Sequence, residues 1–188
     1  EVKQTDQAGA LPACFCVRPR APGLPLLAAL LPFAMSDLVL LSGSPSATSR
    51  SVAVLKDIQT RLEALGLTTS FISVRDFPAE DLILARYDSP TFDRAKAEIE
   101  QAAGLVISTP VYKASYTGTL KTFLDILPQH ALRGKVVLPL ATGGTLAHLL
   151  AIDYSLKPVL CALGATELLQ GVYSTDAQIK VYPGSPLW

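Results

Sequence analysis

Short, uninterrupted apolar runs, each followed by a loop of small residues, constrain the fold of this chain more than any other feature. Leu38-Val39-Leu40-Leu41 leads into Ser42-Gly43-Ser44-Pro45, and Gly104-Leu105-Val106-Ile107 leads into Ser108-Thr109-Pro110. A strand that is buried on one face alternates apolar and polar residues, so these runs are typical of strands buried on both faces. Such strands occur in parallel sheets that are covered by helices on both sides.

Segments with helical spacing lie between the apolar runs. Leu55, Ile58, Leu62 and Leu65 recur on one helical face, and Gly66 ends that helix. The other expected elements are strands at 68–74, 104–110, 135–140 and 167–173, helices at about 91–103, 116–127 and 149–163, and an irregular stretch with a short helical turn at 77–90. This alternation predicts one α/β domain, built as a doubly wound parallel five-stranded sheet.

Two prolines fall inside expected elements. Pro139 removes a ladder donor from the strand at 135–140, which is awkward for a central strand. Pro158 is expected to bend or break the helix at 149–163.

The composition excludes some partners and sites. The chain has 188 residues, with 16 basic and 16 acidic side chains, so its charge gives no reason to expect nucleic acid or an anionic membrane as a partner. Cys14, Cys16 and Cys161 form no C-x-x-C motif and, with two histidines, make no convincing zinc set, so we expect no metal site. We also expect no disulfide framework, which suits a reducing compartment such as the cytoplasm, and we expect Cys161 to be buried.

The first 34 residues differ from the rest, since five prolines punctuate them and no clean period runs through them. Leu24–Phe33 is apolar, but it is too short to span a membrane, contains two prolines and lacks a clear cleavage site. We therefore interpret residues 1–34 as a leader or extension rather than a signal peptide, and residues 35–188 as the domain. The end of the chain shows no helical period, so we expect a domain truncated at its C-terminus, with the last helix missing.

A missing last helix would leave part of one apolar sheet face uncovered. Leu24–Phe33 is a spare apolar element that could lie over that face. The alternative is a leader that takes no part in the domain.

Three loops follow the expected strands, at 42–51, 109–116 and 141–148. Right-handed crossovers place such loops together at the carboxyl edge of the sheet, where ligands of this fold class bind. The first loop supplies hydroxyls, Arg50 and the N-terminus of a helix, a combination that suits a phosphate. It matches neither the P-loop nor G-x-G-x-x-G, and the alternative is a turn that merely caps the helix.

The other two loops offer surfaces for a flat ring. Tyr112 and the backbone around it could pack against such a ring, whereas Lys113 could be only a solvated charge. Adjacent Gly143 and Gly144 permit a close backbone approach to a ligand, but they equally serve an ordinary turn.

Taken together, the loop sequences closely resemble those of the NAD(P)H-dependent FMN reductases of alkanesulfonate-utilisation systems. The resemblance covers about residues 37–173. It rests on Gly43-Ser44-Pro45, Ser49-Arg50-Ser51, Thr109-Pro110-Val111-Tyr112-Lys113, the run from Val136 to Gly144, Pro78–Leu82, Ala85–Pro90 and His148–Pro158.

The resemblance implies a flavodoxin-like fold with FMN in the carboxyl-edge crevice and hydride transfer from NADPH or NADH to flavin N5. It implies that the reduced flavin passes to an FMNH2-dependent monooxygenase, in alkanesulfonate desulfonation for sulfur acquisition. Ser44, Ser49, Arg50 and Ser51 would hold the phosphate. The residues that would line the isoalloxazine are Pro110, Val111, Tyr112, Lys113, Thr142, Gly143 and Gly144. Ser46 stands where the family commonly has arginine, which would weaken phosphate binding.

The family also implies a homodimer or homotetramer, with Asp153 and Tyr154 at a subunit contact. In the relatives an extra residue there makes a π-type bulge, and the alternative is a plain helix kinked by Pro158. Because the flavin and the nicotinamide carry the reaction, we expect no catalytic general base. Two other functions stay open: a quinone or azo reductase that retains its FMN, and a flavodoxin-like electron carrier, which the neutral charge disfavours.

Overall fold

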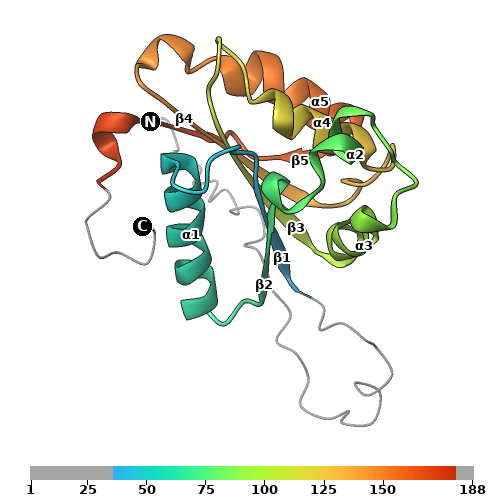
Figure 1. The fold of residues 1–188 in the computed structure, drawn as a ribbon. Helices are drawn as coiled ribbons and strands as arrows, with labels where there is room; N and C mark the ends of the chain where they lie inside the picture. The colour runs from blue at the N-terminus through green and yellow to red at the C-terminus, as the bar shows by residue number, and fades with distance from the viewer. Residues whose placement is uncertain (1–35, 181–188) are drawn as a thin grey trace, which may run out of the picture. The chain divides into compact units, whose positions relative to one another are not determined.

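The computed structural model describes residues 36–180, which form a sheet with helices on both faces (Figure 1). Neighbouring strands are parallel in the order β2-β1-β3-β4-β5, and β6 also pairs with β4. The strands are β1 (Leu38–Ser42), β2 (Thr69–Ser73), β3 (Gly104–Pro110), β4 (Val136–Gly143), β5 (Glu167–Leu168) and β6 (Val172–Thr175). This order is that of a flavodoxin-like, doubly wound sheet, so the predicted fold class is confirmed.

The helices cover the two faces unequally, as Figure 1 shows. They are α1 (Arg50–Ala64), α2 (Ala79–Ile83), α3 (Asp93–Gln101), α4 (Gly118–Ile126) and α5 (Lys157–Ala162). Helix α1 packs on one face, where Leu55 joins Leu40, Val106 and Leu140. The other face holds the larger core, to which α3, α4 and α5 contribute Ile99, Phe123 and Leu160 among others.

Short helices of other types complete the chain. The 3-10 helices are Val74–Asp76, Pro90–Phe92, Leu146–His148 and Asp176–Gln178, and a π-helix spans Ile152–Leu156. The start of α3 at residue 93, rather than 91, reflects the 3-10 turn before it. The predicted end of the first helix is confirmed, because Gly66 adopts φ +84° directly beyond it.

Strand β4 is longer than predicted. It runs to Gly143 instead of residue 140, because Thr142 pairs with Pro110 of β3 and Gly143 pairs with Thr175 of β6. The last residues of this strand, rather than a free loop, therefore form that part of the carboxyl edge.

Pro139 lies inside β4, but its missing N–H faces the stretch between β5 and β6, where β4 has no strand partner among the described residues. The carbonyl of Val137 accepts a hydrogen bond from the Leu169 N–H on the β5 side (2.9 Å). The backbone N–H and C=O groups of residues two apart in a strand point toward the same neighbouring strand. The backbone nitrogen of Pro139 therefore points, like the carbonyl of Val137, toward the β5 side. There the fifth strand position is split into β5 and β6, which is why the single strand predicted at 167–173 is found as two pieces.

The π-type bulge is confirmed by the π-helix Ile152–Leu156. Pro158 does not break the helix: the π-helix runs directly into α5, with helical dihedral angles at both Leu156 and Lys157. The prediction that Cys161 is buried was wrong: this thiol is exposed on α5, because it points away from the sheet that Leu160 contacts.

The predictions for the two ends of the chain fall largely outside the described residues. Leu24–Phe33 lies outside them, so the idea that it covers a sheet face stays a prediction. After β6, the described part of the chain forms only the 3-10 helix Asp176–Gln178. Val172, which pairs with Leu140 and so shares the α1 face, is 51% exposed.

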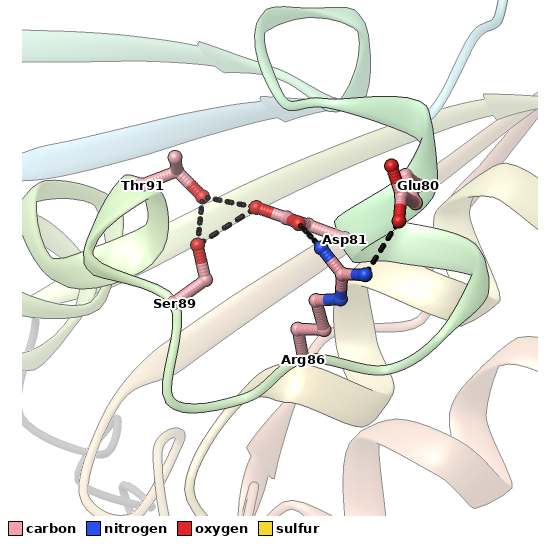
Figure 2. Close-up of polar contacts among 5 residues, drawn as sticks. All are labelled: Glu80, Asp81, Arg86, Ser89 and Thr91. Carbon is pink, nitrogen blue, oxygen red and sulfur yellow. Dashed lines mark hydrogen bonds and ion pairs between the residues drawn. The ribbon is translucent and has the colours of Figure 1, made fainter.

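A polar cluster fixes the segment between α2 and α3 (Figure 2). The nearly buried carboxylate of Asp81 accepts hydrogen bonds from Ser89 Oγ (2.7 Å) and Thr91 Oγ1 (3.2 Å). On its other side Arg86 donates to it (3.3 Å) and also contacts Glu80 (2.5 Å). The Ser89 hydrogen bond is the largest of the effects that lower the pKa of Asp81, and it prevails over partial burial, which acts in the opposite direction.

The lowered pKa predicts acid sensitivity. Because the folded protein binds the Asp81 proton more weakly than the unfolded chain does, this carboxylate stabilises the fold above its ordinary pKa of 3.8. That contribution is lost as the pH falls further. Melting temperatures measured from about pH 6 to about pH 3 should therefore fall more steeply for the natural sequence than for Asp81→Asn.

Asp88→Asn is the matched control, because Asp88 is an exposed carboxylate of the same segment. It should keep the acid sensitivity of the natural sequence. If Asp81→Asn kept it too, other carboxylates would govern acid unfolding.

Candidate functional site

A cavity of about 770 Å³ opens at the carboxyl edge of the sheet. It lies where the loops after β1, β3 and β4 meet, as the sequence predicts for this fold class. Its lining residues are Ser46, Thr48, Ser49, Arg50, Ala53, Pro110, Val111, Tyr112, Thr142, Gly143, Gly144, Asp176, Ile179 and Lys180. The three predicted loops thus share one cavity, and a fourth segment, after β6, joins them.

The first loop is organised by its own serines. Ser49 caps α1, since its hydroxyl accepts a hydrogen bond from the Val52 N–H (3.2 Å), and it also pairs with the Ser51 hydroxyl (2.8 Å). The Ser44 hydroxyl bonds both backbone groups of Ser46 (3.1 Å each). Ser44 and Ser51 are fully buried and outside the cavity lining, so they hold the loop in shape.

The hydroxyls that do line this end of the cavity are those of Ser46, Thr48 and Ser49. They surround the N-terminus of α1, a helix of 15 residues whose dipole favours an anion there. Arg50 adds a guanidinium, which lies 3.3 Å from the Asp176 carboxylate. Hydroxyls, a cation and a helix N-terminus form a donor set that fits a phosphate group.

The second loop lines the cavity with Pro110, Val111 and Tyr112. The Val111 N–H donates to the Thr142 carbonyl (2.8 Å), so this loop continues the pairing of β3 with β4. Tyr112 is half-exposed, and its ring is available for contact with a ligand. Lys113 adopts φ +50° at the turn and does not line the cavity.

The two glycines of the third loop differ in what surrounds them. A Cβ on Gly143 would lie 2.2 Å from the Tyr173 hydroxyl, which donates to the Thr145 carbonyl (2.7 Å). A Cβ on Gly144 would meet nothing within 4 Å. Gly143 is therefore required by packing, whereas Gly144 leaves open space at the cavity wall.

Several lining residues were not predicted from the sequence, namely Ser46 and Thr48 as donors, Ala53, Asp176, Ile179 and Lys180. The strand order offered a signal for Asp176, Ile179 and Lys180, because the segment that follows the fifth strand also lies at the carboxyl edge of the sheet. Among residues 36–180, no group of three or more His, Cys, Asp or Glu side chains is placed to hold a metal ion.

The strand order and this cavity define a flavodoxin-like nucleotide-binding protein. The family model "NADPH-dependent FMN reductase" matches residues 36–179, which is most of the chain. The chain belongs to that family, which confirms the resemblance seen in the loops. It is accordingly an oxidoreductase, an FMN reductase whose cofactors are FMN and a reduced nicotinamide nucleotide.

Similar proteins carry related descriptions. The FMN reductase (NADPH) of Escherichia coli K12 is 50% identical over 149 residues, covering 79% of this chain and 78% of that protein. The NADH-dependent FMN reductase SfnF of Pseudomonas putida is 35% identical, covering 73% and 76%. The apo crystal structure of an NADH:FMN oxidoreductase (EMOB) superposes with a TM-score of 0.71 at 40% identity, covering 76% and 77% of the two chains.

Alanine at each of the two glycines should have different effects. Gly143→Ala should lower the free energy of unfolding by about 1–3 kcal/mol, because its methyl group overlaps the Tyr173 hydroxyl. Gly144→Ala should change it by less than about 0.5 kcal/mol, because it meets only open space, and should weaken flavin binding if the ring lies against this loop. Denaturant unfolding and flavin titration measure the two effects separately.

Tyr173→Phe in the Gly143→Ala background is the control. Removal of the hydroxyl should restore part of the lost stability, although the ring carbon Cζ, 3.2 Å from the new methyl, stays close. Equal stability losses at both glycines would contradict this description of the third loop.

Proposed function

We propose that this chain binds FMN in the carboxyl-edge cavity and reduces it with NADPH or NADH. The flavin phosphate would bind at the first loop, through Ser49 and Arg50, with the isoalloxazine against the second and third loops. The single observation that carries the proposal is the meeting of a phosphate donor set and an open, glycine-lined surface in one cavity. Ser44 and Ser51 lie outside the lining and would act by shaping the first loop. Lys113 also lies outside the lining, in the second loop, which would face the isoalloxazine.

The reaction itself needs no acid–base residue from the protein. When both are bound, the nicotinamide supplies a hydride and flavin N5 accepts it. The residues of the cavity hold and orient the rings, since hydride transfer depends on a short and well-aligned approach. Backbone N–H groups near Gly143 and Gly144 would stabilise negative charge on the reduced ring.

We further propose that the reduced flavin leaves and serves a partner FMNH2-dependent monooxygenase, in alkanesulfonate desulfonation. The support is the set of loop motifs described above, which resemble those of alkanesulfonate-utilisation reductases. Relatives described as NADPH- and NADH-dependent both occur, and the relative that is 50% identical is described with NADPH, which favours that nucleotide. None of the helices within residues 36–180 is long and apolar enough to cross a membrane. A cytoplasmic location accords with the paucity of cysteines.

The π-helix supports a proposal about assembly. Tyr154, within this helix, is 78% exposed, and Leu146, Leu149 and Leu150 beside it are also exposed. Large apolar side chains exposed along one short segment favour a contact with another chain. We propose a homodimer or homotetramer that uses this surface.

Oxidation of NADPH and NADH, with FMN or riboflavin as the only acceptor, tests the catalytic proposal. The natural sequence should consume nucleotide in the presence of FMN. Arg50→Ala should raise the KM for FMN about tenfold and leave that for riboflavin nearly unchanged, because a hydrogen bond to a charged group contributes about 1.5 kcal/mol at a half-exposed site. An equal rise in the KM for FMN and for riboflavin would show that Arg50 does not bind the phosphate.

The same assay, coupled to an FMNH2-dependent alkanesulfonate monooxygenase, tests the partner. Sulfite should form only when reductase, nucleotide and FMN are all present. Nucleotide oxidation with quinones but not with free FMN would favour the quinone-reductase alternative.

The assembly proposal predicts that Tyr154→Asp lowers the molecular mass measured by sedimentation. A charged side chain in place of an exposed aromatic would oppose burial at an interface. Tyr87→Asp is the control, because Tyr87 is similarly exposed (71%) on the separate segment after α2. An unchanged mass for Tyr154→Asp would place the subunit contact elsewhere.

A further inference from the structure

The cavity contains its own anion at the phosphate end. Asp176 lines the cavity, and its Oδ2 lies 3.3 Å from Arg50 Nη1. The two side chains are 41% and 53% exposed, so both reach the solvent from which a ligand arrives. Among the described residues that line the cavity, Arg50 and Lys180 are the cations, and the first of them is already paired.

The position of Asp176 is set by the fold. Thr175, directly before it, pairs with Gly143 at the end of the sheet. Gln178 folds back onto Thr175, whose N–H (2.8 Å) and hydroxyl (3.0 Å) both donate to its side-chain oxygen and so fix the start of the 3-10 helix. The carboxylate is therefore held at the carboxyl edge, opposite the first loop.

The negative charge of Asp176 also acts on Tyr173, three residues before it in the chain. Burial raises the pKa of the Tyr173 phenol, and the negative charge of Asp176 raises it further. Tyr173 is the residue that packs against Gly143 in the third loop. The electrostatic field of Asp176 thus extends from the phosphate loop toward the surface proposed for the flavin ring.

We infer that Asp176 sets how tightly the cavity holds FMN, because its carboxylate competes with the flavin phosphate for Arg50. This inference rests on the proposed function, in which Arg50 binds the phosphate. A phosphate monoester carries a charge of about −1.5 to −2 near neutral pH. On binding, it either displaces the carboxylate from Arg50 or lies beside it, and each arrangement weakens the complex.

The competition acts on FMN and not on riboflavin, since riboflavin has no phosphate. It lowers the preference for FMN below what the first loop alone would provide. It also favours release of the flavin after reduction, because the carboxylate takes the place of the departing phosphate. Asp176 is thus a residue that makes the flavin an exchanging substrate.

Dissociation constants for FMN and riboflavin, measured by flavin fluorescence with the full chain, test the inference. Asp176→Asn should tighten FMN binding about three- to tenfold, from the loss of an exposed ion pair and of charge repulsion, and leave riboflavin binding unchanged. The gain should shrink in high salt, because salt screens charges exposed to solvent. In the Arg50→Ala background, Asp176→Asn should have a smaller effect.

Asp57→Asn is the matched control, because it removes the carboxylate partner of another α1 arginine, Arg61, outside the cavity lining. If Asp176→Asn folds poorly, Asp176→Ser replaces it in the test. The melting temperature of each variant shows whether it is folded. Unchanged or weaker FMN binding by folded Asp176 variants, while Arg50→Ala still loses FMN selectively, would overturn the inference alone. Equal loss of both flavins in Arg50→Ala would instead overturn the phosphate assignment on which it rests.

Discussion

The parallel pairing of β3 with β1 on one side and β4 on the other is the constraint on which the rest of the structure depends. Strand β3 is buried along almost its whole length, and its register runs from Gly104 opposite Leu38 to Pro110 opposite Thr142. Because the three strands run in the same direction, their carboxyl ends reach one edge together. Thr117 then ties two of the loops there, donating to the Gly43 carbonyl (2.5 Å) and accepting from the Leu120 N–H (3.1 Å) at the start of α4.

Much of this arrangement could be predicted from the sequence, because burial on both faces leaves a strong pattern. The apolar runs of β1 and β3 contain no polar side chain before their ends, and together with the helical segments between them they indicate a parallel sheet. The helical spacing of Leu55 and Ile58 and the stop at Gly66 are equally local signals. Once the order of strands and helices is known, the location of the cavity follows from the handedness of the crossovers.

Other features could not be predicted, because they depend on contacts between distant segments. A serine in a loop can point to a ligand or to its own backbone, and the pattern around Ser44 and Ser51 is the same in both cases. The tolerance for Pro139 depends on a gap between β5 and β6, which lie about 30 residues further on. The π-helix was expected only through the family resemblance, since its spacing alone allows an ordinary kinked helix.

The first loop is held by its own hydrogen bonds, and its arginine is paired with a carboxylate from the segment after β6. Serine hydroxyls bonded within the loop hold it in shape, so a phosphate bound there, as we propose, would meet donors whose positions require little further ordering. A preformed site of this kind tends to bind tightly. Under the proposed competition, the Arg50–Asp176 pair opposes that tendency, since the guanidinium that would bind the phosphate already lies 3.3 Å from a carboxylate. If the reduced flavin passes to a partner, as we propose, the site would need both properties: rapid binding in the correct orientation, and a complex weak enough for the reduced flavin to leave.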